Sequence, residues 1–260
     1  MCEPVALPPE TEGIVYEKET GELLSYNKKI LKYDVFRIPE GVKKIPFRFF
    51  AEKLFAGKLI LPSTLTYIDM SAFRGALIEE IVFLDGNKSI WIGSSAFADI
   101  KNLRRVTFPR RLRQLNVGAF ENCTALSEVI FPTQPLYFNL SVGTSAFGGC
   151  ALREVTLPEG VFELSRGAFE KNRRLEAVTL PRSLKGIEGE CFHACPLKRM
   201  TYRGSECDWR TVSKASAQKT VINHYDNSRV GYDWQEDGAT VGAWVDREDF
   251  ELICAGESNA

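Results

Sequence analysis

The sequence repeats itself with a period of about 23 residues, and this repetition limits the fold more than any other feature. A phenylalanine recurs at intervals of 23, 24, 23, 27, 22 and 23 residues. An aliphatic residue lies five positions before each one. The two columns are Phe50, Phe73, Phe97, Phe120, Phe147, Phe169 and Phe192, and Ile45, Ile68, Ile92, Leu115, Val142, Leu164 and Ile187. Self-similarity at such a period is typical of a solenoid, in which each repeat packs on the next.

After each phenylalanine, a polar loop leads into a short run in which large apolar residues flank a β-branched one. This alternation has the two-residue period of a half-buried strand. A single strand per repeat cannot pair with its neighbour as a hairpin, so the strands must stack in parallel. We therefore expect seven rungs in sequence order in one parallel sheet, at residues 59–61, 81–83, 106–108, 129–131, 155–157, 178–180 and 200–202.

The residues around the recurring phenylalanine predict an interior column. Alanine precedes it in five of the seven repeats, as in Ala119-Phe120, which indicates close approach of neighbouring coils. Cys123, Cys150 and Cys195 each follow a phenylalanine by three residues, and we interpret them as small core residues, with disulfide and metal roles as alternatives. The chain has only two histidines, so no zinc site is expected. We also expect no cofactor.

The combined pattern, (I/L)Px(G/S)(V/L)xx(I/L)xxxAFxxCxxLxx(V/I)x(L/F)P, resembles the BspA-type leucine-rich repeat family. The clearest matches are LPEGVFELSRGAFEKNRRLEAVTLP and FPRRLRQLNVGAFENCTALSEVIFP, and the resemblance covers residues 38–202. It implies a right-handed leucine-rich repeat solenoid, horseshoe-like and mostly β, with a parallel sheet on its concave face. It also implies binding of proteins or other macromolecules, often at a bacterial or protist surface.

A solenoid exposes apolar interior at both ends and needs caps there. We expect an N-terminal tail and β-hairpin cap over residues 1–37, with a turn at Thr20-Gly21, and leucine-rich repeats over 38–202. Residues 203–225 form the predicted C-terminal cap, with Trp209 and Val212 as an apolar lid. Residues 226–260 carry nine acidic and two basic residues, a net charge of −7 in a chain of net charge −1. This acidic tail is interpreted as partly ordered or docked on the solenoid.

The concave strand face is the predicted binding surface. A β-branched column and a second column of charged residues with alternating sign run along it, so the face suits recognition of a macromolecular partner. The alternative is a solvated face with weak pairing between rungs. The candidate partner-binding residues are Lys58, Ile60, Glu80, Val82, Arg105, Thr107, Glu128, Ile130, Glu154, Thr156, Thr179, Arg199 and Thr201.

The sequence leaves two other classes of function to consider. One is binding of an acidic macromolecule, a sulfated glycan or nucleic acid by a basic cluster in the third and fourth repeats. No aromatic residue is interleaved with these cations, which argues against nucleic acid. The cluster consists of Lys101, Arg104, Arg105, Arg110, Arg111 and Arg113.

The second class is a cryptic enzyme, for which the sequence offers little. It contains no nucleophile elbow, no HExxH and no phosphate-binding glycine loop. Asp208 and His224 could meet in the C-terminal cap, but they lack a nucleophile. We therefore predict a non-catalytic recognition module with an unknown protein partner.

The termini and the hydropathy bear on location. No apolar run approaches 18 residues, so no membrane span is expected. The first residues, MCEPVALPPE, lack the basic and apolar regions of a signal peptide, which predicts a cytoplasmic protein for the sequence as given. The family resemblance, in contrast, implies a cell-surface location.

Overall fold

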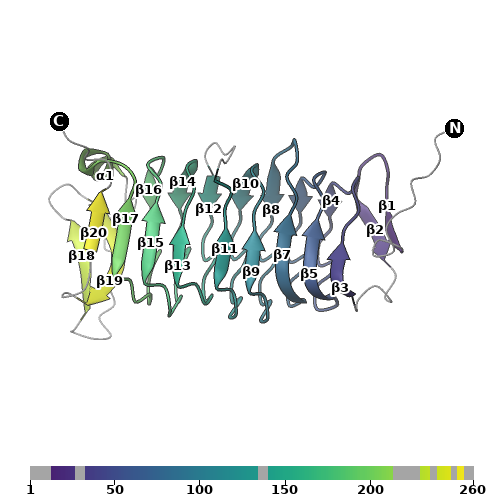
Figure 1. Ribbon diagram of the computed structural model, residues 1–260, viewed down its shortest axis with the longest axis horizontal. Coiled ribbons are helices and arrows are strands. Elements are labelled where there is room, and N and C mark those ends of the chain that lie inside the picture. Colours follow the sequence, from purple (N-terminus) through teal and green to yellow (C-terminus); the bar gives the residue numbers. More distant parts are fainter. Residues whose placement is uncertain are drawn as a thin grey trace.

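The computed structural model describes residues 13–26, 33–133, 140–212, 229–234, 239–246 and 251–254. The chain winds into an elongated stack of coils, with the strands side by side along the long axis of the molecule (Figure 1). The coils carry two rows of parallel strands, one on each of two faces. The fold is therefore the parallel solenoid that the repeat predicts.

The row of strands that contains the predicted rungs forms what we call the main face, which corresponds to the predicted concave face. All seven predicted rungs are found there, and the short ones begin one residue earlier than predicted. The order is β11-β9-β7-β5-β3 in one parallel sheet and β13-β15-β17-β20 in another. Their bounds are β3 (Tyr33–Arg37), β5 (Phe55–Leu61), β7 (Leu77–Phe83), β9 (Arg105–Thr107), β11 (Glu128–Ile130), β13 (Glu154–Thr156), β15 (Ala177–Leu180), β17 (Arg199–Tyr202) and β20 (Glu251–Cys254).

The prediction of one continuous sheet is wrong, because the ladder stops between β11 and β13. Val129 and Val155, which were expected in the same sheet, lie in different ones. The break coincides with the longest repeat: nine residues connect β11 to the next strand, whereas four follow β9. The solenoid itself continues, since the Phe120 N–H still donates to the Ala146 carbonyl at 2.7 Å.

A second parallel sheet of seven very short strands forms the opposite face, and it runs without interruption. Each residue of the predicted aliphatic column is the last residue of one of these strands. Sequence analysis assigned one strand to each repeat and missed this sheet, because its strands vary from two to four residues and do not share one alternating pattern across the repeats. The strands are β4 (Lys44–Ile45), β6 (Tyr67–Ile68), β8 (Ile90–Ile92), β10 (Leu112–Leu115), β12 (Leu140–Val142), β14 (Val161–Leu164) and β16 (Gly186–Ile187).

The turn around each phenylalanine is built from two left-handed residues. In all seven repeats, the residues two before and two after the phenylalanine have φ between 51° and 69°. These paired reversals direct the aromatic ring into the interior. The N–H of Phe73 donates to the carbonyl of Ala96 in the next repeat at 2.8 Å, and the other turns stack in the same way. Ala96 is fully buried between coils, so a larger side chain would not fit there.

The seven phenylalanines form one continuous stack, as predicted. Each is fully buried. Neighbouring ring centroids lie 5.0–5.6 Å apart, and the ring planes differ by only 7–16°. Burying a side chain of this size contributes on the order of 2–3 kcal/mol. The stack is therefore a main source of stability along the whole solenoid.

The cysteine column is confirmed as part of the core, and its thiols also donate hydrogen bonds. The Sγ of Cys123 lies 3.1 Å from the carbonyl oxygen of Phe97, one repeat earlier. Cys150 and Cys195 make the same contact at 3.3 and 3.1 Å with the phenylalanine carbonyl one repeat before their own. In the repeat between them, Asn172 takes this slot and is fully buried. In these four repeats, a small side-chain donor in this slot ties successive turns together.

Burial also makes these thiols hard to ionise. It raises the pKa of Cys123 and of Cys195 to about 12, and it raises the pKa of Cys150 and Cys191 as well. A thiol whose pKa is higher in the folded chain stabilises the fold fully below its unfolded pKa, near 9. We expect that contribution to be lost as the pH rises from about 9 toward about 12.

A labelling experiment tests this burial. In a variant carrying Cys2→Ser, Cys207→Ser and Cys254→Ser, the four buried thiols should resist a disulfide reagent at about pH 8 while the chain is folded. All four should react once the chain is unfolded in urea, because the thiolate then forms freely. Absorbance of the released thiol gives the count. Labelling of the folded variant at the rate of a free cysteine would contradict the buried column.

The N-terminal cap is smaller than predicted. A hairpin of β1 (Ile14–Tyr16) and β2 (Leu23–Tyr26) forms, with its turn over residues 17–22. Residues 33–37, which were assigned to this cap, instead form β3 and pair in parallel with β5. The predicted boundary at residue 37 therefore cuts off a strand of the main face, since the hydrophobic run of β3 lacks the phenylalanine turn before it.

The C-terminal end closes with a short helix, α1 (Glu206–Thr211). Trp209 is buried, with its ring centroid 5.0 Å from that of Tyr202, and Val212 is buried beside it, as expected for the lid. Further along, β18 (Arg229–Trp234) and β19 (Ala239–Asp246) form an antiparallel pair. Strand β20 adds to the main face by pairing in parallel with β17. The rest of the predicted acidic tail lies outside the described residues.

Candidate binding face

The predicted binding residues lie on the outward side of the main-face strands. On β13, for example, Glu154 and Thr156 are exposed while Val155 between them is buried. Twelve of the thirteen predicted residues are exposed or half-buried. Ile60 is the exception, with 6% of its surface exposed, so it offers little to a partner. The main face thus presents a regular array of outward side chains on strands whose inward side chains are packed in the core.

Ion pairs between rungs neutralise the N-terminal part of this array. The Nζ of Lys58 lies 3.2 Å from Glu80, and the guanidinium of Arg105 lies 2.7 Å from Glu128. Both pairs are partly exposed, so each contributes only a few tenths of a kcal/mol. This is the cross-rung pairing that the alternating charges predicted. These two pairs therefore neutralise one charged side chain on each of β5, β7, β9 and β11.

A groove of about 770 Å³ crosses the C-terminal part of the main face, and we call it the face groove. It begins at Ser127 beside β11, spans the break in the ladder and reaches β17. Its charges are mixed, and within it Lys198 lies 3.6 Å from Glu176. The lining residues are Ser127, Glu128, Arg153, Glu154, Glu176, Ala177, Lys198 and Arg199.

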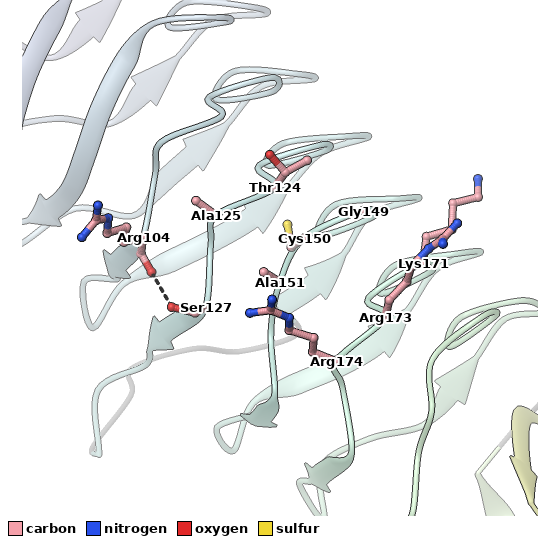
Figure 2. Close-up of a pocket in the computed structure, with 10 residues that line it drawn as sticks. All are labelled: Arg104, Thr124, Ala125, Ser127, Gly149, Cys150, Ala151, Lys171, Arg173 and Arg174. Carbon is pink, nitrogen blue, oxygen red and sulfur yellow. Dashed lines mark hydrogen bonds between the residues drawn. The ribbon is translucent and has the colours of Figure 1, made fainter.

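A second groove, of about 630 Å³, starts at the same serine, and we call it the arginine groove. Figure 2 shows cationic side chains flanking the small residues Ala125 and Ala151, with the Ser127 hydroxyl bonded to the Arg104 carbonyl at 3.4 Å. No carboxylate lines it. The lining residues are Arg104, Thr124, Ala125, Ser127, Gly149, Cys150, Ala151, Lys171, Arg173 and Arg174.

A single missing residue explains the arginine groove. Five positions separate Phe147 from Leu152, whereas six separate the equivalent residues in the repeats before and after. The loop of this repeat is therefore shorter than its neighbours, and it carries only Ala151 where the next repeat carries two arginines. The short loop leaves a depression between two taller ones.

The predicted basic cluster does not form a single patch. Lys101 pairs with Asp99 at 3.1 Å, Arg105 pairs with Glu128, and Arg113 lies on β10 of the second sheet. Of the six cations, Arg104 alone lines the arginine groove. It is joined there by Lys171, Arg173 and Arg174, which sequence reasoning did not single out. The run KNRR was visible in the sequence, but only the stacking of repeats brings it near Arg104.

The residues weighed for catalysis have a structural role or lie outside the description. Asp208 caps α1: its carboxylate accepts a hydrogen bond from the Ser205 N–H at 3.2 Å, and this bond holds the pKa of Asp208 below its ordinary value. It also pairs with Arg182 at 3.1 Å. His224 lies outside the described residues. In the ranges that the structure describes, no group of three His, Cys, Asp or Glu side chains is arranged to hold a metal ion.

Within the described part of the chain, no helix has the length and apolar character needed to cross a bilayer.

Comparison with solved structures finds similar repeat proteins. A leucine rich cell surface protein from Faecalibacterium prausnitzii A2-165 is 21% identical, with a TM-score of 0.37 over 69% of this chain and 62% of that one. A leucine-rich repeat protein from Bacteroides ovatus is 23% identical, with a TM-score of 0.46 over 65% of this chain and 49% of that one. The Treponema pallidum leucine rich repeat protein is 20% identical, with a TM-score of 0.48 over 75% and 85%. The chain thus spans less than two thirds of the first two proteins.

Comparison with protein-family models identifies the repeat itself. The curated proteins gave no match. The model of the BspA type leucine rich repeat region matches residues 26–139 and 91–210, with six copies of the repeat. These ranges cover most of the chain and coincide with the coils seen in the structure. The chain belongs to the BspA-type leucine-rich repeat family.

Proposed function

We propose that this protein is a non-catalytic recognition module that binds a protein partner on its main face. The observation that carries the proposal is the array of outward side chains on the main-face strands. Their inward neighbours, such as Val155 and Val178, are buried in the core, so the array has a fixed spacing and direction. A rigid array loses little conformational entropy on binding, which favours affinity.

The chemistry of the described residues supports binding rather than catalysis. The four thiols of the core are buried, and burial raises their pKa, so none is an activated nucleophile. Asp208 is engaged in capping a helix and in an ion pair. The two grooves are lined by ion pairs, small residues and arginines. Such surfaces suit a macromolecule that covers a wide area.

A capture experiment with matched variants tests the proposal. The immobilised full chain should retain at least one protein from an extract of the source organism. The variant Thr156→Arg, Thr179→Arg and Thr201→Arg places bulk and charge on three adjacent rungs of the main face. We expect it to lose that protein, with at least about a tenfold drop in the amount captured. Quantitative mass spectrometry gives the comparison.

A control variant places three arginines on the opposite face. Gln114→Arg, Ser141→Arg and Glu163→Arg lie on three adjacent strands of the second sheet, where these residues are register neighbours. This variant should capture the same partner as the wild type. If both variants captured the wild-type set, or both lost it equally, the main face would not be the binding surface.

A further inference from the structure

Among the residues that the structure describes, strand β11 has no partner strand on the side that faces β13. In a parallel strand, successive residues direct their N–H and C=O groups to opposite sides. The Glu128 N–H donates to Arg104 at 3.1 Å and the Ile130 carbonyl accepts from Phe108 at 2.9 Å, so both face β9. The backbone of Val129 therefore faces β13, with which β11 shares no ladder among the described residues.

The inward-facing side chain on β11 is also more exposed than its equivalents on the neighbouring strands. The inward-facing position on the neighbouring rungs β9 and β13 is held by Val106 and Val155, and both are buried. Val129 holds this position on β11 and is partly exposed, and 36% of the surface of Ile130 next to it is exposed. Free strand edges tend to pair with another strand. This edge is thus suited to an extended segment of chain.

Uncompensated positive charge lies at one end of this edge. Ser127, the residue before β11, lines the arginine groove. Of the four cations in that groove, Lys171 is paired with Glu170 at 3.3 Å. Arg104, Arg173 and Arg174 form no ion pair with any residue that the structure describes, and all three are exposed. Guanidinium groups bind carboxylates through paired hydrogen bonds, so the groove favours an anionic ligand.

The two features together select a class of ligand. A sulfated glycan would match the arginines, but it has no alternating amide groups to satisfy the backbone of Val129. A protein segment supplies both. We propose that the break between β11 and β13 binds an extended acidic segment of a protein partner, which pairs with the β11 edge and places its carboxylates in the arginine groove. The inference rests on the proposed function and names the partner's chemistry.

This mode of binding makes a specific demand on the ligand. Main-chain hydrogen bonds to the edge provide affinity with little regard to sequence, and side-chain contacts provide selectivity. Because the arginine groove lies at the Ser127 end of β11, the carboxylates should cluster toward one end of the segment. The remaining residues of the segment would cross the face groove, where the charges are mixed.

Peptide selection on the full chain tests the inference. Random peptides of about ten residues, displayed on phage, should yield binders with Asp or Glu clustered near one end. The charge-reversal variant Arg104→Glu, Arg173→Glu and Arg174→Glu should bind the selected peptides at least about tenfold more weakly. The variant Lys53→Glu, Lys88→Glu and Lys185→Glu changes the total charge equally at exposed sites elsewhere and should bind them as the wild type does. Circular dichroism checks that both variants fold.

A modified ligand tests the strand edge without altering the protein. A selected peptide N-methylated at alternate residues loses its donors on one side, so one of the two methylation patterns should weaken binding by at least about tenfold. The other pattern should have a smaller effect. Equal, small effects of both patterns would overturn the pairing with β11.

Other outcomes would also overturn the inference. One is selection of peptides without acidic clusters, or binding that charge reversal leaves unchanged. Another is tight, arginine-dependent binding of heparin with no acidic peptide enriched, which would indicate a sulfated glycan. If the captured partner is lost with the threonine variant but kept with the arginine variant, the proposed function stands and this inference fails.

Discussion

Replacing Phe120 by alanine is expected to lower the free energy of unfolding by about 3–5 kcal/mol. The ring lies between Phe97, at 5.0 Å, and Phe147, at 5.5 Å, with Phe108 edge-on at 5.6 Å. Alanine would leave a cavity in the middle of the stack, and the stacked turns around it are held by backbone hydrogen bonds and cannot collapse easily. Equilibrium unfolding in urea, followed by circular dichroism, gives the difference.

The matched control for this prediction is Phe162→Ala. Phe162 lies on β14 with 41% of its surface exposed, so the same chemical change should cost less than about 1 kcal/mol. Equal losses for the two variants would show that the stack has no special role. A loss below about 1 kcal/mol for Phe120→Ala would contradict the fully buried position of its ring.

Asn172→Ala is the second substitution with a large expected effect. The amide group of Asn172 donates to the carbonyls of Phe147 and Phe169 at 2.7 and 2.8 Å, and its oxygen accepts from the Leu152 N–H at 3.3 Å. Alanine removes all three bonds in a site that water does not reach. Because each buried polar group left unpaired costs about 1–3 kcal/mol, we expect a loss of about 3 kcal/mol in urea unfolding.

Asn172→Cys separates the hydrogen bonds from the packing. Cysteine occupies the same slot in neighbouring repeats, where its thiol donates to a phenylalanine carbonyl, as Cys150 does to Phe120 at 3.3 Å. This variant should therefore keep one donor and lose about half as much stability as Asn172→Ala. An indistinguishable loss for the two variants would show that only the volume of the side chain matters at this position.

The interior could be read from the sequence because large residues recur in fixed columns. Phe73, Phe97 and Phe120 hold equivalent positions in successive repeats, and no other placement buries all of them together. The strands of the main face were located to within a residue or two for a related reason, since their alternation is pronounced. The outward direction of the predicted binding residues followed from these strands. Ile60 is the exception, since its burial depends on its neighbours.

The second sheet and the turn geometry were beyond sequence reasoning. Strands as short as Lys44–Ile45 carry too few residues to show a period. The left-handed positions on either side of each phenylalanine are held by glycine in some repeats and by residues such as Arg48, Lys171 and Glu190 in others. Because tertiary stacking imposes this backbone conformation, residue type alone does not reveal it.

The arginine groove shows how distant segments create a site. Arg104 and Arg174 are separated by three repeats' worth of sequence, and each is unremarkable within its own loop. The depression between them exists because the loop at Ala151 is one residue short. That deletion is visible in the sequence, but its consequence depends on the loops before and after it in the stack.

The sequence by itself determined the solenoid, its interior column and the direction of the main-face side chains, because periodic burial of large apolar residues permits one arrangement. Only the tertiary structure decided that the main-face ladder breaks after β11. The 27-residue interval between Phe120 and Phe147 indicates an insertion. An insertion, however, can bulge outward and leave the ladder intact. Which of these happens depends on whether the backbones of β11 and β13 form hydrogen bonds, and the side chains of the two strands do not reveal that.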